Sequence, residues 1–388
     1  MSIRNDISEL VNAGVIDKET ADKIKEFYGS KGSSSTHRLF LVFGILGAIL
    51  VGLGIILIIA HNWDELSRTI ITILTFLPLI IGQAVCGLAL FKKQDSLTWW
   101  ESGTALLFFS IGASISLVSQ IYHIPGNLSS FLLTWSLLGL PLVYVMRSSI
   151  ASLLFLILIT YYAGETSYWA YPTSESYLYW ILLLLILPHY YYLYRKKPNS
   201  NFIIFHHWLV PLSIVAILGT IEEGTGELMF IAYFSLFGLL YSIGDLDFFI
   251  QQKLRSNGYK VIGSLGTVVL LLILSFDWFW EDLRRKNFMT NELIDSPEFF
   301  ASIVLALLTT TLLYFHQRKG GVNSIKPLAT VYLLFIATFI IGSYSALAVV
   351  LINIFVLAFG TFTIREGAKQ DHLGILNYGL LAITALVV

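Results

Sequence analysis

Thirteen long apolar runs, separated by short polar segments, follow one another along almost the whole chain. A largely uncharged run of about 20 residues can cross the hydrocarbon core of a bilayer as an α-helix. Only 13% of the residues are charged, against about 25% in a soluble domain, so most of the surface must face lipid. We therefore expect an all-α, polytopic integral membrane protein with about 12–13 transmembrane helices. The expected spans lie near residues 39–60, 69–91, 102–121, 131–146, 149–163, 177–194, 202–221, 228–244, 261–276, 300–316, 327–344, 346–364 and 373–388.

The first 38 residues differ from the rest because they are polar and carry charges of both signs. Residues 1–28 are expected to form a cytoplasmic helical hairpin, in which Gly14 ends a first short helix and Asp17 caps the second. Residues 29–38, rich in Ser and Gly, are expected to be a flexible linker. Residues 39–388 then form the transmembrane domain, whose last helix is expected to be a half-span or to be truncated at Val388.

Lys and Arg residues concentrate in every second loop, which predicts the orientation of the chain. With the amino terminus in the cytoplasm, twenty of the 24 basic residues lie on the inside. The outer loops are acidic by contrast, and segment 277–298 among them is expected to form a lid or a short surface helix. The outer tryptophans are expected to lie at the membrane interface; they are Trp63, Trp169, Trp278 and Trp280.

The first candidate site is the turn between the first two apolar runs. It contains His61, Asn62, Trp63, Asp64 and Glu65. Asn62 with Glu65 three residues later fits a helix-capping box, and Trp63 fits an interface anchor, so a structural role explains most of this motif. The alternative is that the imidazole and the two carboxylates face a cavity and bind a cation or a polar head group.

Two stripes of small residues predict close helix packing, which small residues favour in membranes. Gly44, Ala48 and Gly52 form the first stripe, in the first apolar run. Gly112 and Ser116, continued by Gln120, form a second stripe in the third run, which is a plausible counterpart of the first.

The second candidate site lies at the outer end of the third run and contains Gln120, Tyr122 and His123. Because both clusters emerge on the same face, we expect His123 to lie beside Asp64 or Glu65 at the rim of one pocket. The alternative is that both clusters simply point into water, since polar residues are common at helix ends.

No metal or cofactor is expected. Histidines and carboxylates could bind zinc, but their spacing matches no ligand motif. Cys86 is the only cysteine, so no cysteine cluster can form. Within the spans, His189 and His207 lie close to inner ends and are expected to snorkel towards water, whereas Gln83 lies deeper.

Several segments resemble the bacterial membrane protein family catalogued as domain of unknown function 2157. They are residues 10–24, 60–68 and 120–127, followed by Leu133-Thr-Trp135 and Leu140-Pro-Leu142. The resemblance covers the first 150 residues and is only architectural beyond them. It implies a multi-pass protein of the bacterial cytoplasmic (inner) membrane with an amino-terminal helical hairpin, in a longer chain than this one. It implies no activity.

Three functions stay open. Polar residues at the outer helix ends favour a transporter-like protein with an outward-facing polar pocket for an envelope-related small molecule or lipid. The first alternative is a membrane-embedded enzyme that acts on a lipid-linked substrate at the outer face, with His61, Asp64, Glu65 or His123 as acid and base. The second is a scaffold or sensor that docks a cytoplasmic protein partner through its hairpin. The net charge of −1 argues against a nucleic-acid partner, so the bilayer is the main partner expected.

Cysteine labelling from outside the cell tests the orientation. Single cysteines placed near Asp64 and Glu223 should be labelled, because both positions lie in loops that are poor in Lys and Arg. A cysteine near Lys196 should stay unlabelled. Strong external labelling at Lys196 would contradict the orientation.

Overall fold

The computed structural model describes residues 7, 10–11, 13–61, 67–169, 174–250, 252–285, 294–320 and 326–387. Their regular secondary structure is entirely helical, with no strand, which confirms the all-α prediction. Within these residues, eight helices are long and apolar enough to cross a membrane, and one bent helix pair passes the same test together. Three shorter apolar helical segments add to them: Leu39–Gly54, Pro327–Gly342 and Leu373–Val387. The prediction of a polytopic membrane protein is therefore confirmed.

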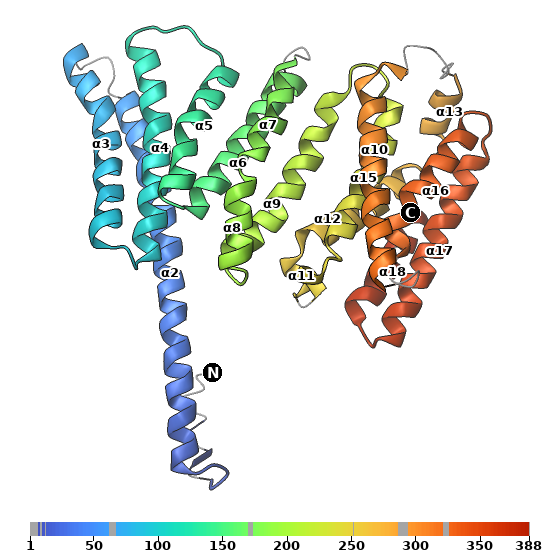
Figure 1. Cartoon of the computed structure of the whole chain (residues 1–388), viewed down its shortest axis with the longest axis horizontal. Helices are drawn as coiled ribbons and strands as arrows, with labels where there is room; N and C mark the ends of the chain where they lie inside the picture. Colours follow the sequence, from blue (N-terminus) through green and yellow to red (C-terminus); the bar gives the residue numbers. More distant parts are fainter. Residues whose placement is uncertain are drawn as a thin grey trace. The chain divides into compact units, whose positions relative to one another are not determined.

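The chain divides into two compact units, Met1–Leu158 and Ile159–Val388, which we call the amino-terminal and carboxyl-terminal units. The boundary falls inside helix α6 (Ser149–Gly164). Before α6, the amino-terminal unit contains α2 (Lys18–His61), α3 (Arg68–Lys92), α4 (Leu97–Ile121) and α5 (Leu128–Val145) (Figure 1).

Helix α2 begins where the sequence predicts a cap. The Asp17 carboxylate accepts a hydrogen bond from the backbone N–H of Thr20 at 3.1 Å, which confirms the predicted N-cap. Hydrogen bonding from Thr20, through its side chain first and its backbone second, lowers the pKa of Asp17. Gly14, in the turn before it, has a φ of +68°, a left-handed conformation that glycine adopts without strain.

Helix α2 then continues without a break for 44 residues. Its length is about 66 Å, roughly twice the ~30 Å hydrocarbon core of a bilayer. Figure 1 shows its amino-terminal half extending beyond the loops of the same unit. The backbone of residues 29–38, predicted as a flexible linker, is helical, because each residue added to a formed helix gains a hydrogen bond. The hairpin as a separate domain stays a prediction.

Helix α4 is the centre of the amino-terminal unit, because α2, α3 and α5 all pack against it. A Cβ atom at Gly44 of α2 would lie 2.6 Å from Oγ of Ser102. A Cβ atom at Gly82 of α3 would lie 2.9 Å from Cα of Leu107. Glycine at these points lets the helices approach closely, and such contacts hold helices together in lipid.

A buried carboxylate joins α4 to the start of α6. Glu101 is only 2% exposed. It accepts hydrogen bonds from the backbone N–H groups of Ser149 and Ile150, at 3.1 and 3.0 Å, and from the Ser148 hydroxyl at 2.5 Å. The first-turn amides of a helix have no partner within it, and they form its positive end, so the carboxylate stabilises α6. The contact also brings the starts of α4 and α6 together, as the predicted alternation of loops requires.

The carboxyl-terminal unit contains two interrupted helices. Helices α7 (Leu178–Leu184) and α8 (Leu187–Lys196) are separated just before Pro188, which cannot donate a backbone hydrogen bond. Helices α12 (Gly258–Ile273) and α13 (Trp278–Arg285) meet at an angle of 73°. The other described elements are η2 (Glu165–Trp169), η3 (Ser174–Tyr177), α9 (Asn201–Leu218), η4 (Gly219–Ile221), α10 (Gly226–Ile243), α11 (Asp247–Ile250), η5 (Leu254–Ser256), α15 (Pro297–Gly320), α16 (Pro327–Gly342), α17 (Leu347–Lys369) and α18 (Leu373–Val387).

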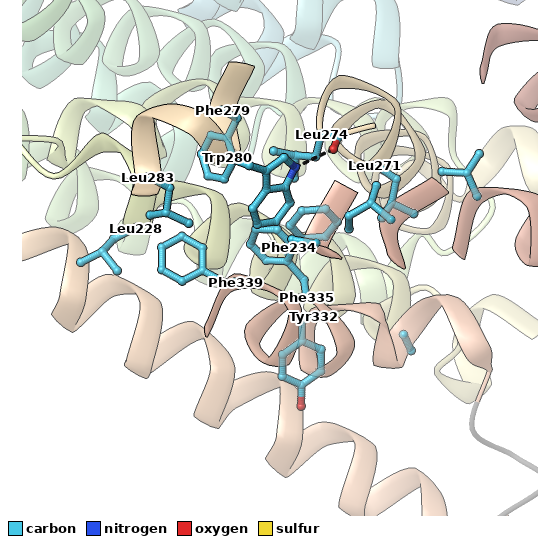
Figure 2. Packing of buried hydrophobic residues seen from close by; sticks show 14 of the residues in the cluster. Leu228, Phe234, Leu271, Leu274, Phe279, Trp280, Leu283, Tyr332, Phe335 and Phe339 are labelled. Atoms are coloured by element: carbon cyan, nitrogen blue, oxygen red, sulfur yellow. Dashed lines mark hydrogen bonds between the residues drawn. The ribbon is translucent and has the colours of Figure 1, made fainter. Parts of the chain in front are cut away.

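The core of this unit gathers around Trp280, which Figure 2 shows among the aromatic rings of α10 and α16. Trp280 is fully buried, and its Nε1 donates a hydrogen bond to the carbonyl of Leu274 at 2.8 Å. Phe234 and Phe335 stack beside it with ring centroids 4.2 Å apart. The prediction of Trp280 as an interface residue is therefore wrong, because the bend before α13 turns its indole into the core. Trp278, two residues earlier, is exposed.

A second buried carboxylate lies at the start of α15. Oε1 of Glu298 accepts hydrogen bonds from the backbone N–H groups of Glu223, Gly224 and Thr225, at 2.8, 3.0 and 3.0 Å. These residues directly precede α10. Glu298 is fully buried, so it fixes the start of α15 against the start of α10 as Glu101 fixes α4 against α6.

Replacing Glu101 by Ala should lower the free energy of unfolding by about 3 kcal/mol, because three buried donors lose their acceptor. Glu101→Gln keeps one acceptor oxygen and should cost less. The matched control is Glu19→Ala, which removes an exposed pair with Lys23 at 2.7 Å and should change stability by no more than about 0.5 kcal/mol. Unfolding in detergent, followed by circular dichroism, measures all three. Equal stability of Glu101→Ala and Glu19→Ala would contradict the tethering role.

Candidate functional site

A groove of about 880 Å³ lies between α3, α4 and α5 of the amino-terminal unit; we call it the α4 groove. Helix α4 forms its floor, because α3 and α5 both pack against α4. Apolar side chains make up much of its lining. Its polar lining residues are Gln83, Ser114, Ser116, Ser119, Gln120, Asn127, Ser130 and Thr134.

The α4 groove runs from the end of α4 towards the middle of the helices. From Gln120 to Ile111 it follows α4 over ten residues, and the nine steps between them span about 14 Å at the rise of an α-helix. On α3 it reaches Gln83, which lies past the middle of that helix. A groove of this depth extends through about half of a ~30 Å hydrocarbon core.

Two hydrogen bonds hold the walls of the groove. Oγ of Ser114 donates to the carbonyl of Thr75 at 2.9 Å and joins α4 to α3. Nε1 of Trp135 donates to the carbonyl of Phe108 at 2.8 Å and joins α5 to α4. Gly112 makes room for the indole, since a Cβ atom there would lie 2.5 Å from Cε2 of Trp135. The walls are therefore fixed, and the space between them is part of the fold.

The end of α4 has the geometry of a Schellman motif, a common helix ending that uses one left-handed residue. His123 is that residue, with a φ of 51°. The backbone N–H of Ile124 donates to the carbonyl of Ser119 at 2.9 Å, and that of His123 donates to Gln120 at 3.4 Å. His123 thus has a structural role that its position in the sequence did not reveal.

The rim of the groove continues into a capping box at the start of α5. The Asn127 side chain accepts a hydrogen bond from the backbone N–H of Ser130 at 2.9 Å. The Ser130 hydroxyl accepts one from the N–H of Asn127 at 3.3 Å. Asn followed three residues later by Ser is a signal in the sequence, but the expected span near 131–146 begins after it.

The predicted site residues are distributed unevenly. Gln120 lines the α4 groove, and Tyr122 lines a second cavity of about 320 Å³ beside Thr69 and Thr72. His123 lines neither cavity. The side chain of His61 and all of residues 62–66, which include Asn62, Trp63, Asp64 and Glu65, lie outside the described residues. The common pocket of His123 with Asp64 or Glu65 therefore stays a prediction.

The two stripes of small residues face different neighbours. A Cβ atom at Gly52 would lie 3.1 Å from Cβ of Phe109, so the stripe from Gly44 to Gly52, with Ala48 between, faces α4. The second stripe does not meet it. Gly112 faces α5, while Ser116 and Gln120 line the α4 groove.

The residues that line the α4 groove are all uncharged within the part of the chain that the structure describes. Acid–base catalysis needs an ionisable group within reach of the substrate, and this lining provides none. Across the same described residues, no three His, Cys, Asp or Glu side chains are grouped so that they could hold a metal ion. What the groove provides is hydrogen-bonding amides and hydroxyls beside apolar walls.

In the carboxyl-terminal unit, the expected snorkelling of His189 and His207 is wrong. His189 is 4% exposed and His207 is 2% exposed. Instead of reaching water, the His189 ring packs against Tyr192 of its own helix and His206 of α9, and the His207 ring packs against Phe249 of α11.

The family comparison agrees with the resemblance expected from the sequence. Residues 8–152 match the family model described as "Predicted membrane protein (DUF2157)". The whole α4 groove lies within this matched part. None of the curated proteins and none of the solved structures compared with the chain gave a match.

The structural role of His123 can be separated from a chemical one. His123→Gly should keep or raise the melting temperature in detergent, because glycine adopts a positive φ without the roughly 1 kcal/mol that a side chain costs there. His123→Val should lower it, since a β-branched residue tolerates this conformation poorly. Equal melting temperatures for the two variants would contradict the capping role.

Proposed function

We propose that this protein is transporter-like and binds an uncharged amphipathic molecule, such as a lipid or a lipid-linked envelope compound, in the α4 groove. The observation that carries the proposal is the carboxamide of Gln83. It lies past the middle of α3, lines the groove, and has no hydrogen-bond partner among the described residues. At this depth an amide that meets only hydrocarbon costs several kcal/mol, and a polar group of a ligand would remove that cost.

Ser116 and Gln120 support the same assignment. Both line the groove one helical turn apart on α4, and their side chains make no hydrogen bond within the described part of the chain. Other lining hydroxyls are already used, since Ser119 donates to Ile124 and Thr134 donates to Ser130. Three side chains therefore keep donors and acceptors for a ligand.

The apolar walls suit a hydrocarbon chain. Phe76 and Leu79 of α3, Ile111 and Ile115 of α4, and Leu138 of α5 line the groove along the same depth. Ligand sites generally combine mostly apolar walls with a few placed polar groups. The absence of charge from the described lining favours an uncharged head group, because a phosphate would require basic partners.

The two alternatives have less support. An enzyme would need a carboxylate and an imidazole within reach of the groove, and neither lines it among the described residues. A scaffold would need no groove of this depth. We place the protein in the cytoplasmic membrane of a bacterium, with the amino-terminal hairpin of residues 1–28 in the cytoplasm and available to a protein partner.

Native mass spectrometry tests the binding step. The purified protein is incubated in detergent with equal amounts of a galactosyl diacylglycerol, which is uncharged, and phosphatidylglycerol, which is anionic. The wild-type protein should retain the galactolipid at least fivefold better. Gln83→Leu and Gln120→Leu should lose this preference. The matched control is Gln94→Leu, since Gln94 lies in the loop after α3, outside the groove, and donates to Leu90.

Transport is measured separately in proteoliposomes that carry a galactolipid with a fluorescent head group. A membrane-impermeant reductant should bleach clearly more than half of the fluorescence when wild-type protein is present, because lipid from the inner leaflet becomes accessible. Gln83→Leu should return bleaching to the value of empty liposomes. Retention of both lipids to the same extent, or bleaching unaffected by Gln83→Leu, would contradict the proposed function.

A further inference from the structure

A cluster of three histidines and two tyrosines lies inside the carboxyl-terminal unit, where α8, α9 and α12 meet. His189 and Tyr190 come from α8, His206 and His207 from α9, and Tyr259 from α12. The three histidines are 4%, 0% and 2% exposed, in that order. Ionisable side chains within membrane helices are costly and usually functional.

Tyr190 connects His206, His207 and Tyr259 within the cluster. Its ring stacks on His206, with centroids 5.7 Å apart and planes 15° apart. Its hydroxyl contacts Nδ1 of His207 and donates to the hydroxyl of Tyr259 at 3.3 Å. We assign to His207 the tautomer whose Nδ1 donates to Tyr190, because the Tyr190 hydroxyl directs its own hydrogen to Tyr259. Nε2 of His207 then has only a lone pair.

Two nitrogens of the cluster are buried without a hydrogen-bond partner among the described residues, Nε2 of His207 and Nε2 of His189. Buried polar atoms nearly always have a partner, and one that has none calls for an explanation. The ring of His207 packs instead against Phe249, with centroids 4.8 Å apart. Neither of the two cavities of the amino-terminal unit is lined by these residues.

The charges on the elements around His207 do not satisfy these nitrogens. The two carboxylates on the segments that face it are each paired with a lysine: Asp245 with Lys260 at 2.5 Å, and Asp247 with Lys319 at 3.3 Å. The remaining charged groups on these segments are cations at the helix ends: Arg195 and Lys196 in the last turn of α8, Lys197 directly after it, and Lys253 and Arg255 around η5. Of the titratable groups nearby, Tyr190 and Tyr259 face His207, and Tyr194 lies one ring away across Phe248. His206 is its neighbour in the chain, and His189 lies beside His206.

We infer that this histidine–tyrosine cluster is a proton-binding site that loosens the packing of α8 on α9 and α12 when the pH falls. A proton from solvent adds to the lone pair of Nε2 of His207, while Nδ1 keeps its hydrogen bond to Tyr190. The product is a buried imidazolium with a second N–H and no carboxylate beside it. A buried charge without a partner is strongly unfavourable, so the charged state favours separation of the helices and entry of water. Nε2 of His189, which is buried without a partner among the described residues, is the second candidate for a proton.

Hydrogen–deuterium exchange of the full chain in lipid nanodiscs, analysed by mass spectrometry, tests this inference. Exchange is measured at pH 7.5 and pH 5.5 and corrected for the intrinsic dependence of exchange on pH. In the wild-type protein, peptides from residues 187–197 and 254–262 should exchange at least tenfold faster at the lower pH. The double variant His189→Gln/His207→Gln should lose this acid response, because an amide takes up no proton in this range. Melting temperatures at pH 7.5 establish that the variant is folded.

The matched control is His316→Gln, which removes a histidine of α15 whose Nδ1 contacts the carbonyl of Leu312. It should keep the full acid response. An acid response of unchanged size in the double variant, or none in the wild-type protein, would overturn the inference. If the double variant does not fold, the two single variants replace it, and an unchanged response in both would overturn the inference equally.

Discussion

The bilayer offers no hydrogen-bond partners to a polar group, and this constraint governs the fold of the protein. Glu101 and Glu298 show how it is met. Each carboxylate is buried, and each accepts hydrogen bonds from backbone amides at or just before the start of a neighbouring helix. In both places backbone amides that would be costly alone donate to a buried carboxylate; at Glu298 all three donate to Oε1, and Oε2 has no partner among the described residues. These pairs join α4 to α6 and α15 to α10.

Because of the same constraint, polar atoms that have no hydrogen-bond partner indicate positions with a function. Gln83 and Gln120 line the α4 groove without a partner in the described residues, and Nε2 of His189 and His207 are buried without one. The two situations differ physically. An amide in an open groove has room beside it for a ligand. An imidazole nitrogen packed against Phe249 has room for little more than a proton. We therefore assign a ligand to the first and a proton to the second.

Features that depend on neighbours in the sequence could be predicted from it. The cap at Asp17, the interruption at Gly14 and the helical class of the apolar runs all depend on a few consecutive residues. Features that depend on distant residues could not. Glu101 meets Ser148, 47 positions away, and Trp280 turns into the core because α13 bends by 73° from α12. Of the candidate site, the sequence predicted Gln120 near the carboxyl-terminal end of α4, but not the groove between α3, α4 and α5 that it lines.

By itself, the sequence determined that this is a polytopic all-α membrane protein, because the length and hydropathy of each apolar run suffice to identify a membrane-spanning helix. The tertiary structure alone decided which side of each helix meets which neighbour. Helices that are apolar on all sides have little hydrophobic periodicity, so their sequence does not reveal which face is packed. Glycines and single hydrogen bonds determine which helices pack together. Gly112 against Trp135, and Ser114 with Thr75, set α5 and α3 on α4, and the space left between them is the α4 groove.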